Sequence, residues 1–265
     1  MRRPPLLPLV LVMALAGCAH HRPAQDPAGL YKALARHALA RGEPARALEV
    51  LSEAWRRAPQ DPEVLALRGV ALREQGLLRE AETELAEAVR LRADYAWAHA
   101  QYGVLLDLAE RREEALPHHE KAVQLEPDNA SYLNNLAFSR FARGQLALAI
   151  EDYRRAVRLQ PADGRIRNNL GFALARSGDF RQAAEQFRHA GPPAEARNNL
   201  GFAYELAGNL AQAYELYLEA MRLDPGAKQA RANLAHVAAR LGRPGVPGLL
   251  QPSASEAASG KEQER

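Results

Sequence analysis

Residues 144–163 read GQLALAIEDYRRAVRLQPAD, and residues 76–94 read GLLREAETELAEAVRLRAD. Each stretch opens on a glycine, carries alanine at matching places and closes on a polar segment. Units of the same design begin at residues 28, 62, 96 and 130, which places them 34 residues apart. A fixed period of this length indicates a repeat protein, in which every repeat is one supersecondary unit. We therefore expect the fold to be built by stacking these units.

Six such units align along the chain. They span residues 28–61, 62–95, 96–129, 130–163, 164–193 and 194–227. The eighth residue of each unit is alanine or glycine, and the twentieth and twenty-seventh residues are always alanine. Two helices cross closely only where the side chains at the crossing are small. The pattern therefore predicts two packed helices in every unit.

A glycine marks the expected turn between the two helices, because glycine adopts backbone conformations that other residues resist. The turn glycines are Gly42, Gly76, Gly144, Gly178 and Gly208. The fifth unit is shorter than the others, since it has 30 residues and its second helix runs into Gly191-Pro192-Pro193. We expect that helix to end at Ala190, about one helical turn early.

The unit resembles the tetratricopeptide repeat (TPR), a helix–turn–helix motif of the same length. The resemblance implies an all-α TPR solenoid of about six repeats, stacked into a superhelix with a concave and a convex side. Residues 228–241 (KQARANLAHVAARL) have apolar residues at helical spacing, which predicts a C-terminal capping helix. We expect the superhelix to cover residues 28–242. Residues 243–265 are rich in proline, glycine, serine and charge, and are expected to form a disordered tail.

The first residues have the character of a targeting segment. Two arginines precede an apolar run of 12 residues, Leu6–Gly17. This run is too short to span a bilayer, because a spanning helix takes about 20 apolar residues. A positive start, a short apolar core and small residues at its end predict a signal peptide over residues 1–17.

The lone cysteine, Cys18, follows Leu15-Ala16-Gly17, and this tetrapeptide resembles the bacterial lipobox. The resemblance implies that Cys18 carries fatty acyl chains such as palmitate, with residues 18–27 as a polar tether. Two or more chains anchor a protein firmly to a membrane. By the sorting rule of enteric lipoproteins, Ala19 implies the periplasmic face of the outer membrane. The alternatives are an ordinary signal peptide with an incidental cysteine, and a buried cysteine of an intracellular helix.

Charge and motifs argue against nucleic-acid binding and against catalysis. The net charge is +3 and falls to +1 without Arg2 and Arg3, whereas nucleic-acid-binding domains usually show a marked basic excess. The chain contains no HExxH, no glycine-rich phosphate loop and no CxxC. We therefore expect no enzyme, no cofactor and no metal site. In the pair His118-His119 we expect one packed and one solvated side chain.

Asparagine and phenylalanine recur together in the first helix of units four to six. At positions five and nine the residues are Asn134, Phe138, Asn168, Phe172, Asn198 and Phe202. Asparagine is a poor helix former, so its recurrence inside three predicted helices indicates a specific role for the side chain. In proteins that resemble this one, both positions face the concave groove, where an amide can donate to and accept from a peptide backbone. These six residues form the candidate peptide-binding groove. The alternative is that the amides bond within the scaffold and the rings fill gaps between helices.

Units one to three lack this pattern and carry Arg36, Arg73 and Trp97 at groove positions. Trp97 is a candidate for a second anchor of a bound segment, or else a core residue.

A lipobox, six TPR units and a polar tail together resemble the TPR lipoproteins of pilus and secretin systems. The match is to the TadD family of tight-adherence (Flp) pilus assembly, which is related to the pilotins PilF and PilW. The resemblance implies a lipid-anchored scaffold that binds a secretin or pilus-assembly subunit at the outer membrane. A second hypothesis is a periplasmic adaptor similar to NlpI, which docks cell-wall hydrolases or proteases. An enzyme with TPR units attached is a third, disfavoured because little sequence remains for a catalytic domain.

Overall fold

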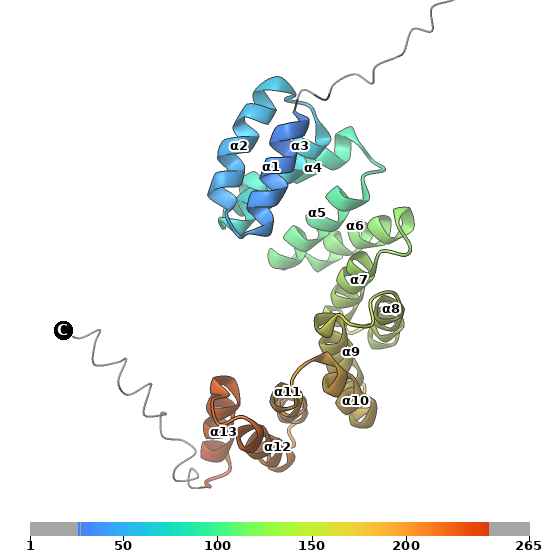
Figure 1. Cartoon of the computed structure of the whole chain (residues 1–265). Helices are drawn as coiled ribbons and strands as arrows, with labels where there is room; N and C mark the ends of the chain where they lie inside the picture. The colour runs from blue at the N-terminus through green and yellow to red at the C-terminus, as the bar shows by residue number, and fades with distance from the viewer. Residues whose placement is uncertain (1–25, 27, 244–265) are drawn as a thin grey trace, which may run out of the picture.

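A computed structural model describes residue 26 and residues 28–243 of the chain (Figure 1). The predicted signal peptide (1–17), Cys18, almost all of the tether and all but the first residue of the predicted tail lie outside the described residues. The part of the chain that the structure describes consists of α-helices joined by short turns. The helices are α1 Gly29–Ala40, α2 Pro44–Arg57, α3 Pro62–Glu74, α4 Leu78–Leu91, α5 Ala96–Leu108, α6 Arg112–Leu125, α7 Ala130–Ala142, α8 Leu146–Leu159, α9 Gly164–Arg176, α10 Phe180–Ala190, α11 Pro193–Leu206, α12 Leu210–Leu223 and α13 Lys228–Arg240.

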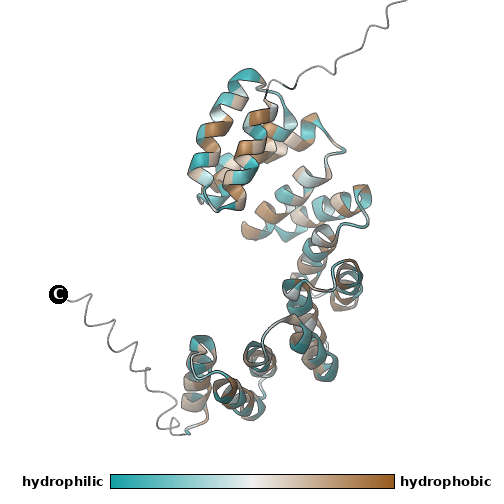
Figure 2. Cartoon of the chain, viewed as in Figure 1, coloured by the Kyte–Doolittle hydropathy of each residue, from teal (hydrophilic) through white to brown (hydrophobic). Residues whose placement is uncertain are grey.

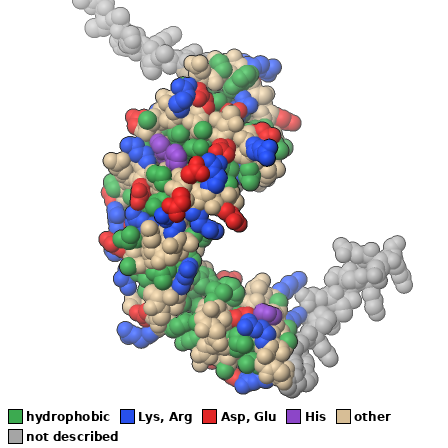
Figure 3. Space-filling model, turned by 180° about the vertical axis from the view of Figure 1, so that it is seen from behind, with side chains coloured by type: hydrophobic (Ala, Val, Ile, Leu, Met, Phe, Trp, Pro, Cys, Tyr) green, Lys and Arg blue, Asp and Glu red, His purple; other side chains and the backbone are tan. Residues whose placement is uncertain are grey.

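These helices form six antiparallel pairs and one final helix, which confirms the all-α TPR solenoid predicted from the repeat. Every odd-numbered helix contacts the next odd-numbered helix, from α1 and α3 through to α11 and α13. Among the helices described, no two even-numbered ones pack closely on each other, although Arg154 on α8 donates a hydrogen bond to Gln182 on α10 at 2.9 Å. The odd-numbered helices therefore lie on the inner side of the curve. The result is a crescent whose concave side opens between its two arms (Figures 1 and 3).

The small residues of each unit mark the crossing of its two helices. A Cβ atom added to Gly171 would lie 2.6 Å from Cε1 of Phe187, and one added to Gly201 would lie 2.8 Å from Cε1 of Tyr217. Both rings belong to the second helix of the same unit and are almost fully buried. The alanines at position twenty have no exposed surface; they are Ala47, Ala81, Ala115, Ala149, Ala183 and Ala213. Figure 2 shows apolar and polar residues interspersed along the helices, and the buried residues of second helices such as α4 and α10 lie on one stripe.

The turns between paired helices have the predicted chemistry. The five turn glycines have φ angles between 71° and 93°, a left-handed conformation that glycine adopts at no steric cost. In the third unit Glu110 takes this place with φ 59°, and it is the one non-glycine residue with positive φ in the described chain. Helices α3, α7 and α9 begin at the N-caps Asp61, Asn129 and Asp163, whose side chains accept hydrogen bonds from backbone N–H groups of the first turn.

The fifth unit, which has fewer residues than the others, has a shorter second helix. Helix α10 has 11 residues and ends at Ala190, whereas α8 and α12 have 14. The end of α10 then lies directly against the start of α9, so that a Cβ atom on Gly164 would overlap the carbonyl oxygen of Ala190. Glycine at this position permits the close approach of these two helix ends.

The burial of the pair His118-His119 differs from the prediction in one of its two members. His119 is buried, as one member was predicted to be, but His118 is half buried instead of solvated. Its ring centroid lies 5.2 Å from that of His99 and 4.5 Å from that of Tyr102, both on α5. Burial, together with the neighbouring His99 and His119, lowers the pKa of His118 to about 4. The expectation failed because adjacent residues on α6 both lie within the groove between α5 and α6.

None of the helices described here combines the length and the apolar character that a membrane-spanning helix needs.

Candidate functional site

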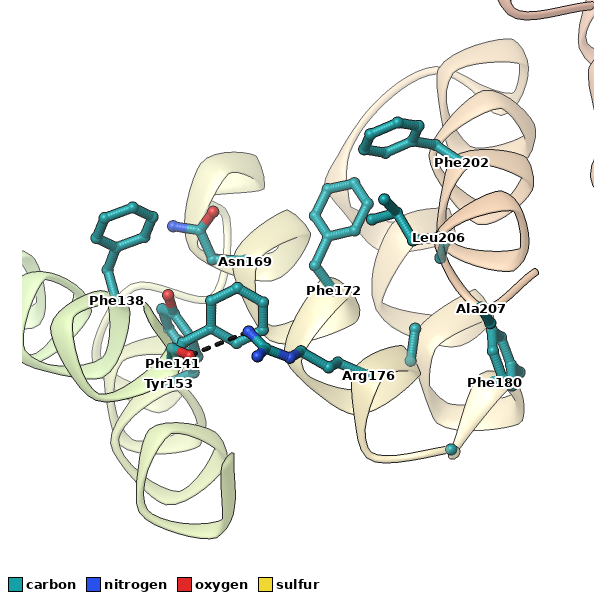
Figure 4. Close-up of a pocket in the computed structure, with 13 residues that line it drawn as sticks. Phe138, Phe141, Tyr153, Asn169, Phe172, Arg176, Phe180, Phe202, Leu206 and Ala207 are labelled. Atoms are coloured by element: carbon teal, nitrogen blue, oxygen red, sulfur yellow. Dashed lines mark hydrogen bonds between the residues drawn. The ribbon is translucent and has the colours of Figure 1, made fainter. Parts of the chain in front are cut away.

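A pocket opens on the inner face of the solenoid near the ends of α7, α9 and α11 (Figure 4). Its volume is about 710 Å³, which is within the usual range for pockets that bind ligands. We call it the aromatic pocket. Its lining consists of Phe138, Phe141, Tyr153, Asn169, Phe172, Ala175, Arg176, Gly178, Phe180, Phe202, Ala203, Leu206 and Ala207.

The structure brings the three phenylalanines of the predicted groove together in this pocket. Phe138 and Phe202 stand at opposite sides of it and are 48% and 41% exposed (Figure 4). Phe172 lies between them and is half buried. Its ring centroid is 4.9 Å from that of the buried Phe187 and 6.1 Å from that of Phe202, with edge-to-face geometry in both pairs. Phe172 therefore joins the pocket to the hydrophobic core.

Several lining residues were not anticipated from the sequence. Phe141 and Phe180 add two more rings, and Phe180 stacks on Tyr204 with ring centroids 4.1 Å apart. Leu206 is 70% exposed at the end of α11. These residues fall outside positions five and nine, so the repeat pattern did not single them out. The available signal was that Phe141 and Leu206 are large apolar residues near the end of a first helix, where most other units have charged or small ones, with Leu39 and Leu108 as the exceptions.

The pocket has one charged lining residue, Arg176. Its guanidinium lies over the ring of Phe141, 4.8 Å from the centroid, and Nη1 donates to the backbone carbonyl oxygen of Phe141 at 3.2 Å. No acidic side chain is among the lining residues of this pocket. The surface therefore combines apolar walls with a positive charge at its edge.

The predicted groove asparagines are placed differently from the phenylalanines. None of Asn134, Asn168 and Asn198 lines the aromatic pocket. Their Oδ1 atoms each accept a hydrogen bond from the asparagine at position six of the next first helix. The donors and distances are Asn169 to Asn134 at 2.9 Å, Asn199 to Asn168 at 3.1 Å and Asn233 to Asn198 at 3.0 Å. We call this series the amide ladder.

The amide ladder joins α7, α9, α11 and α13 along the inner face. Asn134 is 4% exposed, so its oxygen has little access to water. A buried polar group of this kind needs a partner, and the neighbouring repeat supplies it. The geometry thus corresponds to the scaffold alternative for these amides. Asn169, which donates to Asn134, also reaches the edge of the pocket.

A second, smaller cavity lies in the first three units. It has a volume of about 480 Å³ and includes Arg36, Arg73, Trp97 and Gln101. Arg73 donates from Nη1 to Oε1 of Gln101 at 3.0 Å, and Arg36 forms an ion pair with Glu63. Trp97 also packs against the hydrophobic clusters of units one to three. It is therefore both a core residue and a lining residue.

His119, Asp107 and Ser139 lie together but do not form a catalytic triad. His119 Nε2 lies 2.9 Å from Oδ2 of Asp107, and Ser139 Oγ lies 3.4 Å from Oδ1 of the same carboxylate. The carboxylate stands between the other two groups, so the hydroxyl has no histidine to accept its proton. Within the described residues, no three histidine, cysteine or acidic side chains cluster as metal ligands do.

The repeat predicted from the sequence is matched by known family models. Models of the tetratricopeptide repeat match residues 38–102, 139–178, 194–227 and 228–245. The structure of MamA (residues 41 to the end) from Desulfovibrio magneticus RS-1 is 32% identical and covers 62% of this chain and 93% of its own, with a TM-score of 0.53. The chain belongs to the tetratricopeptide repeat family. Such repeats generally serve as non-catalytic scaffolds for protein interactions.

Two further TPR structures are similar to this chain. YrrB, described as a TPR protein with an unusual peptide-binding site, is 25% identical, covers 68% of this chain and 95% of its own, and gives a TM-score of 0.54. PilW, described as a widely conserved type IV pilus biogenesis factor, is 18% identical, covers 78% of this chain and 98% of its own, and gives a TM-score of 0.67. At that identity the likeness to PilW shows a shared TPR fold. No curated protein matches the chain in sequence.

Proposed function

We propose that this TPR protein is a scaffold whose aromatic pocket holds an apolar segment of a partner protein. The observation that carries the proposal is the uncovered apolar surface of Phe138, Phe202 and Leu206 on one concave face. Soluble proteins rarely leave a contiguous apolar patch open without a binding role. YrrB, whose description names a peptide-binding site, offers a precedent in the same fold.

The chemistry of the pocket defines the kind of segment it would bind. Five phenyl rings favour aliphatic or aromatic side chains, and Arg176 favours a carboxylate close to them. Burying one such side chain contributes about 1.5–3 kcal/mol, and each backbone hydrogen bond adds about 0.5–1.5 kcal/mol. Association costs on the order of 4–15 kcal/mol. Several such contacts are therefore needed to offset the cost, and a multimeric partner that engages more than one solenoid binds more tightly.

The proposal also includes a membrane anchor, a cellular location and a class of partner. Acyl chains on Cys18 would hold the solenoid at the periplasmic face of the outer membrane, and the bound segment would belong to a secretin or pilus-assembly subunit. Two observations support this: the lipobox-like tetrapeptide before Cys18 and the TPR fold shared with PilW. The mechanism needs no covalent step, because binding and localisation together suffice to bring a subunit to its membrane.

Affinity purification of the lipidated protein from its native membranes, followed by mass spectrometry, tests this function. We expect secretin or pilus-assembly subunits with the wild-type chain and their loss with a variant carrying Phe138→Ser, Phe202→Ser and Leu206→Ser. Cell-wall hydrolases or proteases as the specific partners would support the adaptor hypothesis instead. Equal recovery of every protein by both chains would show that the aromatic pocket does not bind the partner.

A further inference from the structure

The aromatic pocket and the end of the described chain lie at the same edge of the solenoid. Leu206 and Ala207 line the pocket at positions thirteen and fourteen of their unit. The residues at the same positions of the final helix α13 are Arg240 and Leu241. The described chain ends two residues later, at Arg243. Residues 244–265 therefore start beside the pocket, one helix away.

Side-chain contacts confirm how close the two helix ends are. Glu205, the neighbour of Leu206, accepts from His236 Nδ1 at 3.0 Å and from Arg240 Nη1 at 3.4 Å. Helix α13 packs directly on α11, and packed helices lie about 8–10 Å apart. An extended chain spans at most ~3.3–3.6 Å per residue, so the six residues from Arg243 to Leu249 reach about 20 Å. That length is sufficient to return to the pocket.

The segment beyond Arg243 has the composition of a pocket ligand. It begins PGVPGLLQPS, and Leu249 and Leu250 are its largest apolar side chains. The remaining residues up to Arg265 are small, polar or charged. Prolines at 244, 247 and 252 each have a fixed φ and disfavour the helical conformation in the residue before them. Each of these three prolines therefore has less backbone entropy to lose on binding.

We propose that Leu249 and Leu250 of the chain's own C-terminal segment occupy the aromatic pocket and compete with the partner. The inference rests on the proposed function, because it assigns a regulator to the same pocket. A tether of this length gives an effective concentration on the order of millimolar. Even a weak, millimolar contact would then fill about half of the pockets, so the partner's apparent affinity falls about twofold.

Disulfide trapping in the full chain tests the occupant directly. Cys18→Ser removes the native thiol, and Leu206→Cys with Gln251→Cys places one thiol in the pocket and one beside the leucine pair. The matched control pairs Gln251→Cys with Leu223→Cys, because Leu223 is 55% exposed at the end of α12 and does not line the aromatic pocket. Isotope-labelled and unlabelled chains are mixed, oxidised and analysed by mass spectrometry.

We expect the pocket pair to form at least fivefold faster than the control pair, with both peptides from the same isotopic chain. Adding Leu249→Asp and Leu250→Asp should reduce that rate to the control value. Equal rates for the two pairs would overturn the inference. So would cross-linked peptides of mixed isotopic origin, because the occupant would then be the tail of a second copy.

A capture experiment separates this inference from the proposed function. In the otherwise native chain, Leu249→Asp with Leu250→Asp should raise the apparent affinity for the partner about twofold, whereas Ser253→Asp with Ser255→Asp should not. Capture that is unchanged by the leucine substitutions but lost with the pocket variant would overturn self-occupancy and leave the binding function standing.

Discussion

The side-chain amide nitrogen of Asn169 lies 2.9 Å from Oδ1 of Asn134, and this hydrogen bond joins α9 to α7 on the inner face of the solenoid. It links two repeats through side chains that repeat in register along the chain. The same contact recurs between the next two pairs of first helices. The amide ladder therefore holds the repeats in the alignment that brings Phe138, Phe172 and Phe202 into one pocket.

We predict that Asn169→Ala lowers the free energy of unfolding by about 1–3 kcal/mol, because it leaves the Oδ1 of Asn134 buried without its donor. Asn135→Ala is the matched control. It occupies the same position one unit earlier, where position five of the preceding unit is Ala100 and offers no side-chain acceptor. Urea denaturation of the two variants measures the difference. Equal stability of both would mean that the amide ladder does not hold the repeats together.

We predict that Gly164→Ala destabilises the fifth unit by roughly 1–3 kcal/mol, the usual cost of forcing an extra carbon into a packed site. The added Cβ would overlap the carbonyl oxygen of Ala190, and a backbone atom cannot move aside as a flexible side chain can. Hydrogen exchange of the amides in α9 and α10 reports the local effect. A variant with the same protection as the wild-type chain would contradict the close approach of these two helices.

The pH dependence of stability should reveal the buried position of His118. Its pKa falls from 6.5 to about 4 on folding, through burial and the neighbouring His99 and His119, while Glu114 acts in the opposite direction. Below pH 6.5 the unfolded chain therefore binds a proton that the folded chain does not, and stability decreases as the pH falls from 6.5 to about 4. We expect a loss of about 1 kcal/mol by pH 5, reduced by the partial exposure of the ring.

Thermal unfolding at pH 7.5 and pH 5 measures this loss, which corresponds to a shift of about 2–4 °C in Tm for a chain of this size. His118→Leu keeps an apolar side chain between His99 and Tyr102 and removes the titrating group. The variant should lose less stability on acidification than the wild-type chain. An identical pH dependence would show that His118 titrates as it does in the unfolded chain.

The anchor at Cys18 is tested by fractionation. We predict that Cys18→Ser leaves the outer-membrane fraction and is found unprocessed or in the periplasmic fraction, because no acyl chain can be attached. Immunoblots of separated membranes and periplasm give the result. A variant that still fractionates with the outer membrane would rule out lipid on Cys18 as the anchor.

The packing of the two helices within each repeat could be predicted from the sequence more fully than the contacts between repeats. Alanines at positions twenty and twenty-seven and the turn glycines specify how two helices pack within a unit, and the structure confirms that arrangement. The meeting of Phe138, Phe172 and Phe202 follows from the same period. The packing within a unit depends on residues close together in the chain, whereas the three rings meet because position nine recurs in successive units.

Contacts between repeats depend on the angle at which units stack, and a single sequence does not state that angle. Asn134 and Asn169 are 35 residues apart, and nothing local indicates that the second donates to the first. The exposure of Leu206 and the position of Arg176 over the ring of Phe141 also follow from stacking. For this reason the pocket's rings were partly predictable, and a scaffold role for the asparagines was one of two alternatives, whereas the partner of each asparagine and the charged edge of the pocket were not.

The most direct test of the binding claim compares two sets of substitutions of equal exposure. The pocket set is Phe138→Ser, Phe202→Ser and Leu206→Ser, at residues that are 48%, 41% and 70% exposed. The control set is Leu148→Ser, Leu159→Ser and Leu30→Ser, at residues that are 46%, 41% and 70% exposed and do not line the aromatic pocket. Both sets remove similar apolar surface, so solubility and non-specific adhesion change alike.

Isothermal titration with the segment of the captured partner gives the dissociation constant for the wild-type chain and for both variants. We expect the pocket set to raise it at least tenfold, which corresponds to about 1.4 kcal/mol, and the control set to leave it within a factor of two. A pocket set that binds the segment as tightly as the wild-type chain would contradict the claim that this concave aromatic surface holds the partner.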